Sequence, residues 1–320
     1  MTRIIRRLLI AAWLWISFVH ASAVTIPEYA YTGDMSINGP VIGDDVTAIG
    51  EGAFAGSGVQ TAIIPASVKN IGAYAFADCR KLVKAEIPEG VTVLHAGTFR
   101  GCTSLREVSL PSTLEKIESD VFAATALESI DLSRCIRLRA IGERSFAGCE
   151  ALRSIKLPDN ITRIENSAFF GCMALNEVDF PASLLYIGDC ALACTDNISM
   201  IHLPASLCRI GSNAMEGMMS LSGIDGSDLK RVPTLGDNVW YGLPQHDIRL
   251  TVPSQLRDTF LSSPQWCEFN ITGNTGAIVS PTTTDSGIKS VMHYRVSEID
   301  ITVTLFNDGT RRVDKILRTK

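Results

Sequence analysis

The sequence is short of basic residues, aromatic residues and histidine. Over 320 residues it carries 29 Lys and Arg against 34 Asp and Glu, a formal net charge of −5 at pH 7, with 7% aromatic residues and five histidines. A protein that binds nucleic acid would present a basic face, so this balance argues against a nucleic-acid partner. Hydrophobic residues still make up 46% of the chain, which excludes disorder of the whole chain and predicts a large buried core.

Motifs that carry catalysis or bind metals are absent as well. The sequence contains no Gly-x-Ser-x-Gly, no His-Glu-x-x-His and no phosphate-binding loop. After residue 23 the histidines are widely separated, and none begins a metal-binding motif: His95, His202, His246 and His293. We therefore expect a protein that is not an enzyme and that has no catalytic residues, no cofactor and no metal site.

Only one stretch of the chain is apolar enough to enter a membrane, and it lies near the N-terminus. Three arginines among the first seven residues precede an apolar run from Leu8 to Val19, and Ala21-Ser22-Ala23 follows. This order predicts a signal peptide over residues 1–23, because a run of 12 residues is too short to cross about 30 Å of hydrocarbon. We expect an exported chain that starts at Val24, has no membrane span and resides outside the cell or on its surface, with the periplasm as the alternative.

A unit of about 23 residues repeats through the middle of the chain. An isoleucine column from Ile49 to Ile210, a proline column from Pro65 to Pro204 and a cysteine column keep the same period. The clearest column is aromatic and then apolar: Phe54, Phe76, Phe99, Phe122, Phe146, Phe169, Leu192 and Met215. A fixed period of this length predicts a repeat solenoid of eight or nine coils, in which stacked units bury ladders of like residues.

Each unit contains one short strand and turns, but no regular helix. In the segment from Leu105 to Pro111, Val108 and Leu110 alternate with polar residues, which is the period of a strand. Proline then ends the strand because it cannot donate to a β-ladder. The pattern predicts a fold of short parallel strands that is mostly β and turn, with few helices.

The unit Ile-Gly-x-x-Ala-Phe-x-x-Cys-x-x-Leu-x-x-Ile-x-Leu-Pro resembles the BspA-type leucine-rich repeat, the 23-residue class of the Treponema pallidum type. It recurs nearly intact in Ala75–Pro88, Thr98–Pro111, Ser145–Pro158 and Ala168–Pro181. The resemblance implies a curved leucine-rich-repeat superhelix, display on a bacterial surface or secretion, and binding to host or bacterial proteins. It also implies a closing unit made of a strand, a short helix and a final strand.

These patterns divide the chain into five parts. After the signal peptide we expect an N-terminal cap over 24–45 and the solenoid over 46–272, with a C-terminal cap at about 240–272. Residues 273–287 have the composition of a flexible linker. In 288–320 the alternation from Ile299 to Leu305, a turn at Asn307-Asp308-Gly309 and a return from Arg312 predict a β-hairpin, which either docks on the solenoid or serves as a sorting or attachment segment.

Nine cysteines in an exported chain raise the question of disulfides. Four of them hold one column of the repeat, where Thr and Met substitute: Cys79, Cys102, Cys149 and Cys172. A position that also accepts Thr or Met favours a buried free thiol over a bridge. If a disulfide forms, we expect it among Cys190, Cys194 and Cys208, which lie in the weaker repeats.

The outward positions of the strands are the candidate binding surface, since solenoids bind partners across extended strand faces. Two outward columns contain six acidic residues against two lysines. The candidate binding face is the C-terminal half of these columns: Asp131, Lys156, Glu177, Asp179, Met200, His202 and Asp225. One hypothesis is a binding protein or adhesin for a host matrix or bacterial surface protein. The other is a structural scaffold or spacer of the bacterial surface with no dedicated ligand site.

Overall fold

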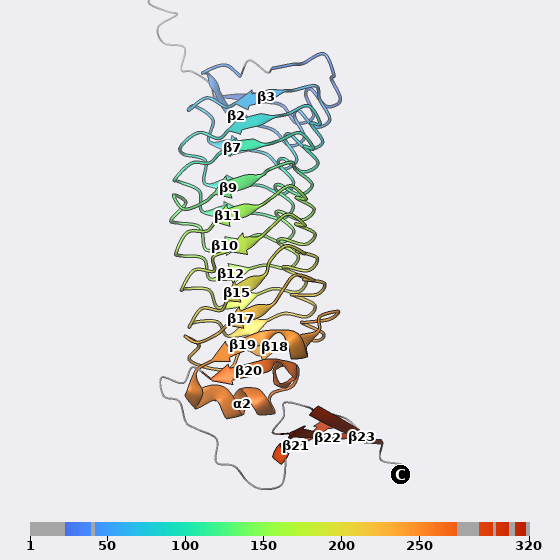
Figure 1. Cartoon of the computed structure of the whole chain (residues 1–320). Helices are drawn as coiled ribbons and strands as arrows, with labels where there is room; N and C mark the ends of the chain where they lie inside the picture. Colours follow the sequence, from blue (N-terminus) through green and yellow to red (C-terminus); the bar gives the residue numbers. More distant parts are fainter. Residues whose placement is uncertain (1–22, 40–41, 274–287, 297–298, 307–310, 318–320) are drawn as a thin grey trace, which may run out of the picture.

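The protein is described here by a computed structural model that covers residues 23–39, 42–273, 288–296, 299–306 and 311–317. Its main body is a parallel β-solenoid of about 11 turns with little helix (Figure 1). The number of turns exceeds the eight or nine coils expected, because the segments at both ends add turns of their own. Val24–Ile26 pairs with the first repeat, and two further strands extend the other end beyond Asp225.

One ladder of the solenoid is formed by the predicted Ile-x-Leu segments. In-register pairs such as Lys84 with Glu107 and Met200 with Gly223 confirm the predicted alignment of the outward columns. Hydrogen-bonded pairing is interrupted twice, between the third and fourth strands and between the sixth and seventh. The strands are β3 (Thr61–Ile63), β5 (Lys84–Glu86), β7 (Glu107–Ser109), β9 (Ser129–Asp131), β11 (Ser154–Lys156), β13 (Glu177–Val178), β15 (Met200–His202), β17 (Gly223–Asp225), β19 (Arg249–Val252) and β20 (Asn270–Gly273).

A second ladder follows the isoleucine column, which the repeat pattern did not mark as strand. Most of its strands have only two residues, too few for any visible alternation. They are β1 (Val24–Ile26), β2 (Val46–Ile49), β4 (Asn70–Ile71), β6 (Val93–Leu94), β8 (Lys116–Ile117), β10 (Ala140–Ile141), β12 (Arg163–Ile164), β14 (Tyr186–Ile187), β16 (Arg209–Ile210) and β18 (Thr234–Leu235).

The core between the two ladders is a stack of like side chains, as predicted. Six phenylalanine rings from Phe54 to Phe169 are at most 1% exposed, and neighbouring rings stack with centroids 5.1 to 5.7 Å apart. Leu192 and Met215 continue the stack and are fully buried. Because each coil buries its ring only against its neighbours, the coils depend on one another for stability.

Each coil turns through two residues of left-handed backbone, four positions apart. Gly52 and Gly56 take these places in one coil, with φ of 57° and 64°. In a later coil the same two places are held by Cys190 and Cys194, with φ of 53° and 59°. A residue with a side chain costs about 1–2 kcal/mol in this conformation, so the fold imposes local strain wherever glycine is absent.

The C-terminal cap has the predicted order of strand, short helix and final strand. Between β19 and β20 lie η2 (Ser254–Leu256), α2 (Arg257–Ser262) and η3 (Trp266–Glu268), and η1 (Gln245–Asp247) precedes β19 (Figure 1). Trp240 takes the place of the ladder phenylalanine and packs against Trp266, with ring centroids 5.3 Å apart. Trp266 is 1% exposed, so the cap covers the apolar end of the stack.

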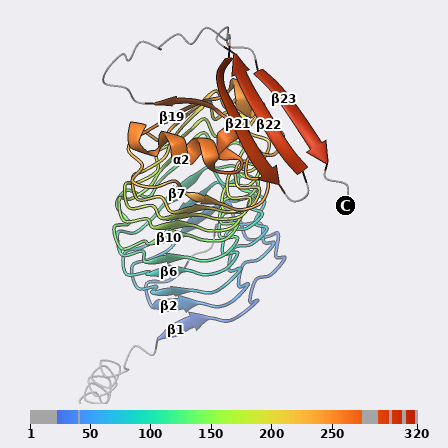
Figure 2. The same ribbon diagram turned by 90° about the horizontal axis from the view of Figure 1, so that it is seen from below.

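Beyond the cap, the C-terminal segment forms a three-stranded antiparallel sheet, β21 (Ile288–Val296), β22 (Ile299–Phe306) and β23 (Arg311–Leu317) (Figure 2). The predicted hairpin corresponds to β22 and β23, and β21 is an additional strand paired with β22. Within the described residues, no helix has the length and apolar character needed to cross a membrane. The expected signal peptide and linker lie outside the described residues, apart from Ala23 and Gly273.

Candidate functional site

The predicted binding face lies on the ladder from β9 to β17, and most of its side chains are exposed. Asp131, Lys156, Glu177, Asp179, Met200 and His202 are exposed, and Asp225 is half-buried. The structure does not bring them together as one acidic patch. It divides them into the Lys156–Asp131 ion pair, the His202–Asp225 contact, two acids with no partner among the described residues and one exposed methionine.

The first pair joins Lys156 Nζ to an oxygen of Asp131 at 3.7 Å, across the neighbouring strands β9 and β11. Asp131 also accepts a hydrogen bond of 2.9 Å from the backbone N–H of Ser133. The hydrogen bond from Ser133 and the nearby Lys156 lower the pKa of the Asp131 carboxyl. This aspartate therefore has a local role, because it closes the turn where serine replaces the usual proline.

Asp225 repeats this arrangement four strands further on. It accepts a 2.9 Å hydrogen bond from the N–H of Ser227, and His202 Nδ1 lies 3.3 Å from its Oδ2. Partial burial acts to raise the pKa of the Asp225 carboxyl, but the hydrogen bonds from Ser227 and the contact with His202 outweigh it, so the pKa is lowered. Two of the predicted site acids are thus also turn-forming residues.

Glu177 and Asp179 are exposed, and neither side chain has an ion-pair or hydrogen-bond partner among the described residues. Strand β13 ends at Val178, so Asp179 lies just beyond the ladder. Hydrogen-bonded strand pairing also stops between β13 and β15, next to these acids. They form the open acidic flank of the face.

A hollow interrupts the face at Gly223, where the outward column has no side chain. In register, Met200 lies on one side of Gly223 and Arg249 on the other. A Cβ added at Gly223 would lie 2.6 Å from Cε of Met200, so the methionine side chain lies across the glycine. We call this hollow of about 360 Å³ the Gly223 notch; it is lined by Met200, His202, Gly223, Ile224, Asp225, Ser227, Arg249 and Thr251.

Arg249 and Thr251, which complete this hollow from β19, were not predicted from the sequence. The alternation in Arg249-Leu-Thr-Val252 was visible, but the repeat had already decayed there, so its outward residues were not aligned with the columns. The notch offers an exposed apolar contact from Met200, which is 47% exposed, next to the cation of Arg249 and the His202–Asp225 pair. That combination offers apolar, cationic and hydrogen-bonding contacts side by side. Among the described residues, no group of His, Cys, Asp and Glu side chains could hold a metal ion.

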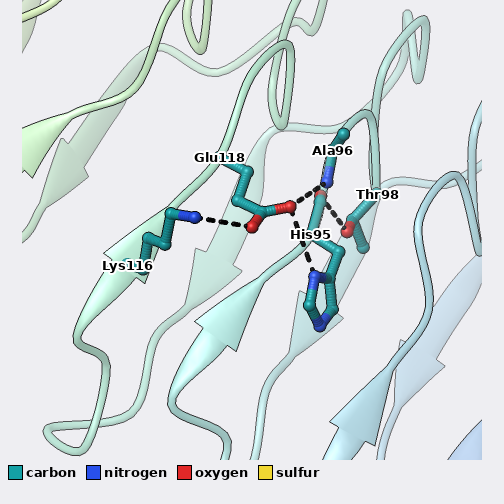
Figure 3. A network of polar contacts seen from close by, with 5 residues as sticks. All are labelled: His95, Ala96, Thr98, Lys116 and Glu118. Carbon is teal, nitrogen blue, oxygen red and sulfur yellow. Dashed lines mark hydrogen bonds and ion pairs between the residues drawn. The ribbon is translucent and has the colours of Figure 1, made fainter.

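The face of the second ladder carries a polar network around Glu118 (Figure 3). Glu118 accepts hydrogen bonds from Lys116 at 2.8 Å and from the Ala96 N–H at 3.2 Å, and it lies 3.2 Å from His95 Nδ1. The hydrogen bond from Lys116 and the contact with His95 lower the pKa of Glu118. The Thr98 hydroxyl donates to the backbone carbonyl of His95, away from the imidazole, so no hydroxyl is activated.

The cysteine column is buried, as predicted, and each thiol donates to a backbone carbonyl of a preceding coil. Cys79 donates to Phe54 and Cys102 to Phe76, at 2.9 and 3.0 Å. In the structure the four thiols of this column are free, and so are Cys190, Cys194 and Cys208, where a disulfide was considered. Burial raises the pKa of the Cys149 thiol, which fits a structural residue rather than a reactive one.

A family model for the BspA type leucine rich repeat region matches residues 24–138 and 136–245, with six copies. The chain belongs to this BspA-type leucine-rich repeat family. Proteins built from these repeats are interaction scaffolds, and the family is not one of enzymes. No curated protein matches the sequence.

Several solved structures are similar to this BspA-type chain. A leucine-rich repeat protein from Eubacterium ventriosum has a TM-score of 0.51 at 18% identity, over 68% of this chain and 67% of that chain. One from Bacteroides ovatus has a TM-score of 0.48 at 21% identity, over 80% and 76%. The leucine-rich repeat protein of T. pallidum has a TM-score of 0.41 at 22% identity, over 56% and 74%. The Eubacterium structure supports the repeat-solenoid fold.

Proposed function

We propose that this chain is a secreted or surface-displayed protein that binds another protein through the Gly223 notch and its acidic flank. The observation that carries the proposal is the missing side chain at Gly223 between Met200 and Arg249. The rest of the outward columns is a solvated strand surface, in which Ile63 is the other exposed apolar side chain. Here the column has a depression with an exposed apolar wall.

The chemistry of the notch fits a protein side chain better than a small metabolite. Met200 is flexible and polarisable, so it can adapt to an apolar side chain placed over Gly223. Arg249 can form a bidentate contact with a carboxylate on the partner. The hollow is open on the strand face, whereas sites for small molecules are concave and enclose most of their ligand.

The remaining predicted residues extend the contact toward the middle of the solenoid. Glu177 and Asp179 have no partner among the described residues, so basic groups on a bound protein can reach them. Asp131 and Lys156 already pair with each other and serve mainly to set the edge of the surface. Rim charges of this kind steer association more than they add affinity.

Export rests on the first 23 residues, whose charged start, apolar run and Ala-Ser-Ala end are those of a signal peptide. A surface or secreted location is typical of BspA-type leucine-rich repeat proteins, the family to which the chain belongs. N-terminal sequencing of the protein from the culture medium tests this step. We expect Val24 as the first residue; a mature form starting at Met1 would contradict export by cleavage.

The binding proposal is tested by filling the notch. Gly223→Gln places a side chain in the hollow, and the atoms that it meets belong to the flexible end of Met200. The matched control is Ser154→Gln, which adds a similar side chain at an exposed position of the same column on β11. Immobilised wild-type and variant proteins are incubated with a panel of extracellular matrix proteins and with whole bacteria.

We expect the wild type and Ser154→Gln to retain the same partner and Gly223→Gln to lose at least about tenfold in affinity, since the notch would be occupied. Equal retention by all three proteins would place the site elsewhere. If the wild type retained nothing, the chain would instead fit a scaffold or spacer of the bacterial surface.

A further inference from the structure

Among the residues that the structure describes, nothing covers the N-terminal end of the solenoid. Almost all residues from Ala23 to Asn38 are exposed. Tyr31 forms the first rung of the aromatic ladder and stacks on Phe54 with ring centroids 5.1 Å apart, yet it remains 43% exposed. The other face of this ring therefore has no partner within the described residues.

The backbone at this end is also left without partners. In the next coil the carbonyls of Glu51, Ala53 and Ala55 each accept an N–H from the first coil, at 2.7 to 2.8 Å. Their counterparts one coil earlier are the carbonyls of Glu28, Ala30 and Thr32, which receive no donor from the described residues. Strand β1 is an edge strand, paired only with β2. The end thus presents a row of unused acceptors beside a free strand edge.

The opposite end shows what a closed terminus looks like in this protein. There Gln265 Oε1 accepts the N–H of Val239 at 2.9 Å, and Gln265 Nε2 donates to the Gly236 carbonyl at 2.7 Å. Trp266 covers the last rung and donates its indole N–H to the Pro233 carbonyl at 3.0 Å. No described element performs these tasks at the N-terminal end.

The charge of the open end is of one sign. Residues 24–68 contain five acidic residues and no Lys, Arg or His: Glu28, Asp34, Asp44, Asp45 and Glu51. Unused carbonyls add partial negative charge at the same place. Exposed tyrosine rings attract cations as well. The best occupant is therefore a basic segment in extended conformation.

The chain contains such a segment. The last ten residues carry five basic residues and one acid. Seven of these ten residues form β23 (Arg311–Leu317), an edge strand of the antiparallel sheet β21–β22–β23. We propose that strand β23 of one copy binds the N-terminal end of a second copy, by adding to the free edge of β1. Strand addition supplies the backbone hydrogen bonds, and the opposite charges set the partner and the orientation.

This contact joins two different surfaces of the chain, so it is heterologous. A heterologous contact that does not close into a ring leaves one free N-terminal end and one free β23 after each addition. The chains therefore add head to tail, and assembly continues past a dimer as the concentration rises.

The test is a charge exchange followed by analytical ultracentrifugation of the exported chain. One variant reverses the end (Glu28→Lys with Glu51→Lys), a second reverses the strand (Arg311→Glu with Arg312→Glu), and a third carries all four changes. The control, Glu150→Lys with Asp159→Lys, changes exposed charges in the middle of the solenoid. Thermal unfolding of each protein shows that the solenoid is intact.

We expect the wild type and the control to form species larger than dimers, and each single reversal to weaken association by at least about tenfold. The variant with all four substitutions regains association, because the charges of the N-terminal end and of β23 are again opposite. Raising NaCl from about 50 mM to about 500 mM weakens all association, since exposed charges are screened. The proposal would be overturned if the wild type stayed monomeric or stopped at a dimer. It would also be overturned if neither charge reversal changed the association.

Discussion

The coils from Phe54 to Phe169 and the coils from Leu192 to Trp240 have the same backbone path but different side chains. In the first group the ladder is a stack of phenylalanine rings, each at most 1% exposed. In the second group the ladder residue changes from Leu192 to Met215 and then to Trp240. The outward column changes with it, from ordinary polar residues to Met200, Gly223 and Arg249.

We infer from this difference that the regular coils mainly stabilise the solenoid, whereas the decayed coils are the ones suited to recognition. Repeated coils stabilise the column because each adds the same ring contact to its neighbours. Where the repeat decays, the core is filled by residues of different shape, and the surface acquires the Gly223 notch. We therefore propose that the region that departs from the repeat is the one that binds selectively.

The largest expected effect is the loss of one ring from the regular stack. Phe146→Ala removes contacts with rings on both sides, at 5.4 and 5.5 Å. We expect it to lower the free energy of unfolding by about 3–5 kcal/mol. The matched change Leu192→Ala, in the decayed group, removes no ring stacking and costs about 1 kcal/mol less. Urea unfolding followed by circular dichroism measures both, and a larger loss for Leu192→Ala would break the comparison.

The two groups of coils should also differ in how fast their cysteine thiols react. Burial raises the pKa of the enclosed Cys149 and Cys172 thiols, and it also raises the pKa of the half-buried Cys190 and Cys194. Access to reagent therefore decides the rates. In the native protein we expect alkylation of Cys190 and Cys194 to be at least about a hundredfold faster, since the enclosed thiols react only after unfolding. Peptide mass spectrometry over time gives the order; faster labelling of Cys149 would contradict it.

Substitutions at residues with left-handed backbone should change the free energy of unfolding by a smaller amount, and the sign of the change can be predicted. Cys194→Gly relieves a side chain held at φ 59°, so we expect it to stabilise the protein by about 1 kcal/mol. Gly217→Ala introduces a side chain at the equivalent place of the next coil, where φ is 70° and the nearest side-chain atom is 3.7 Å away. It should destabilise by a similar amount. Thermal unfolding of both variants checks the signs, and stabilisation by Gly217→Ala would contradict this account of the turn.

The smallest effect concerns the turns at Asp131 and Asp225, one in each group. Replacement of either residue by Ala removes a hydrogen bond to a serine N–H and should cost about 0.5–1.5 kcal/mol, while Asn retains an acceptor. Both carboxyls have a lowered pKa in the folded state. Their contribution is therefore present above the unfolded pKa of about 4 and is lost as the pH falls through the lower folded value. Unfolding at pH 7 and at about pH 2 measures it; Ala variants as stable as the wild type at pH 7 would exclude the role.

The repeat columns predicted most of the fold because each column records one environment many times. The ladder of Phe76, Phe99, Phe146 and Phe169 and the register of the outward strands were read from spacing alone. The second ladder was missed because two-residue strands have no alternation to detect. Strand β21 was missed although Ile288, Met292 and Tyr294 alternate with Lys289, His293 and Arg295.

The candidate site was predicted less completely. The columns located Met200, His202 and Asp225, but they did not reveal the local partners of Asp131 and Asp225. The structure shows that both are engaged by serine N–H groups and by a neighbouring Lys or His. Arg249 could not be aligned with the outward column, because it lies after the point where the 23-residue repeat can no longer be recognised. The columns of a single sequence show what repeats, whereas the proposed site lies where the repeat ends.

The central claim is that the decayed coils, rather than the regular ones, contact the partner. Hydrogen–deuterium exchange of the exported chain, with and without a saturating amount of the protein that it retains, tests this directly. We predict that the added protection falls on the backbone amides of β15, β17 and β19, around the Gly223 notch. Protection confined to β3, β5 and β7, or to the second ladder, would contradict the account.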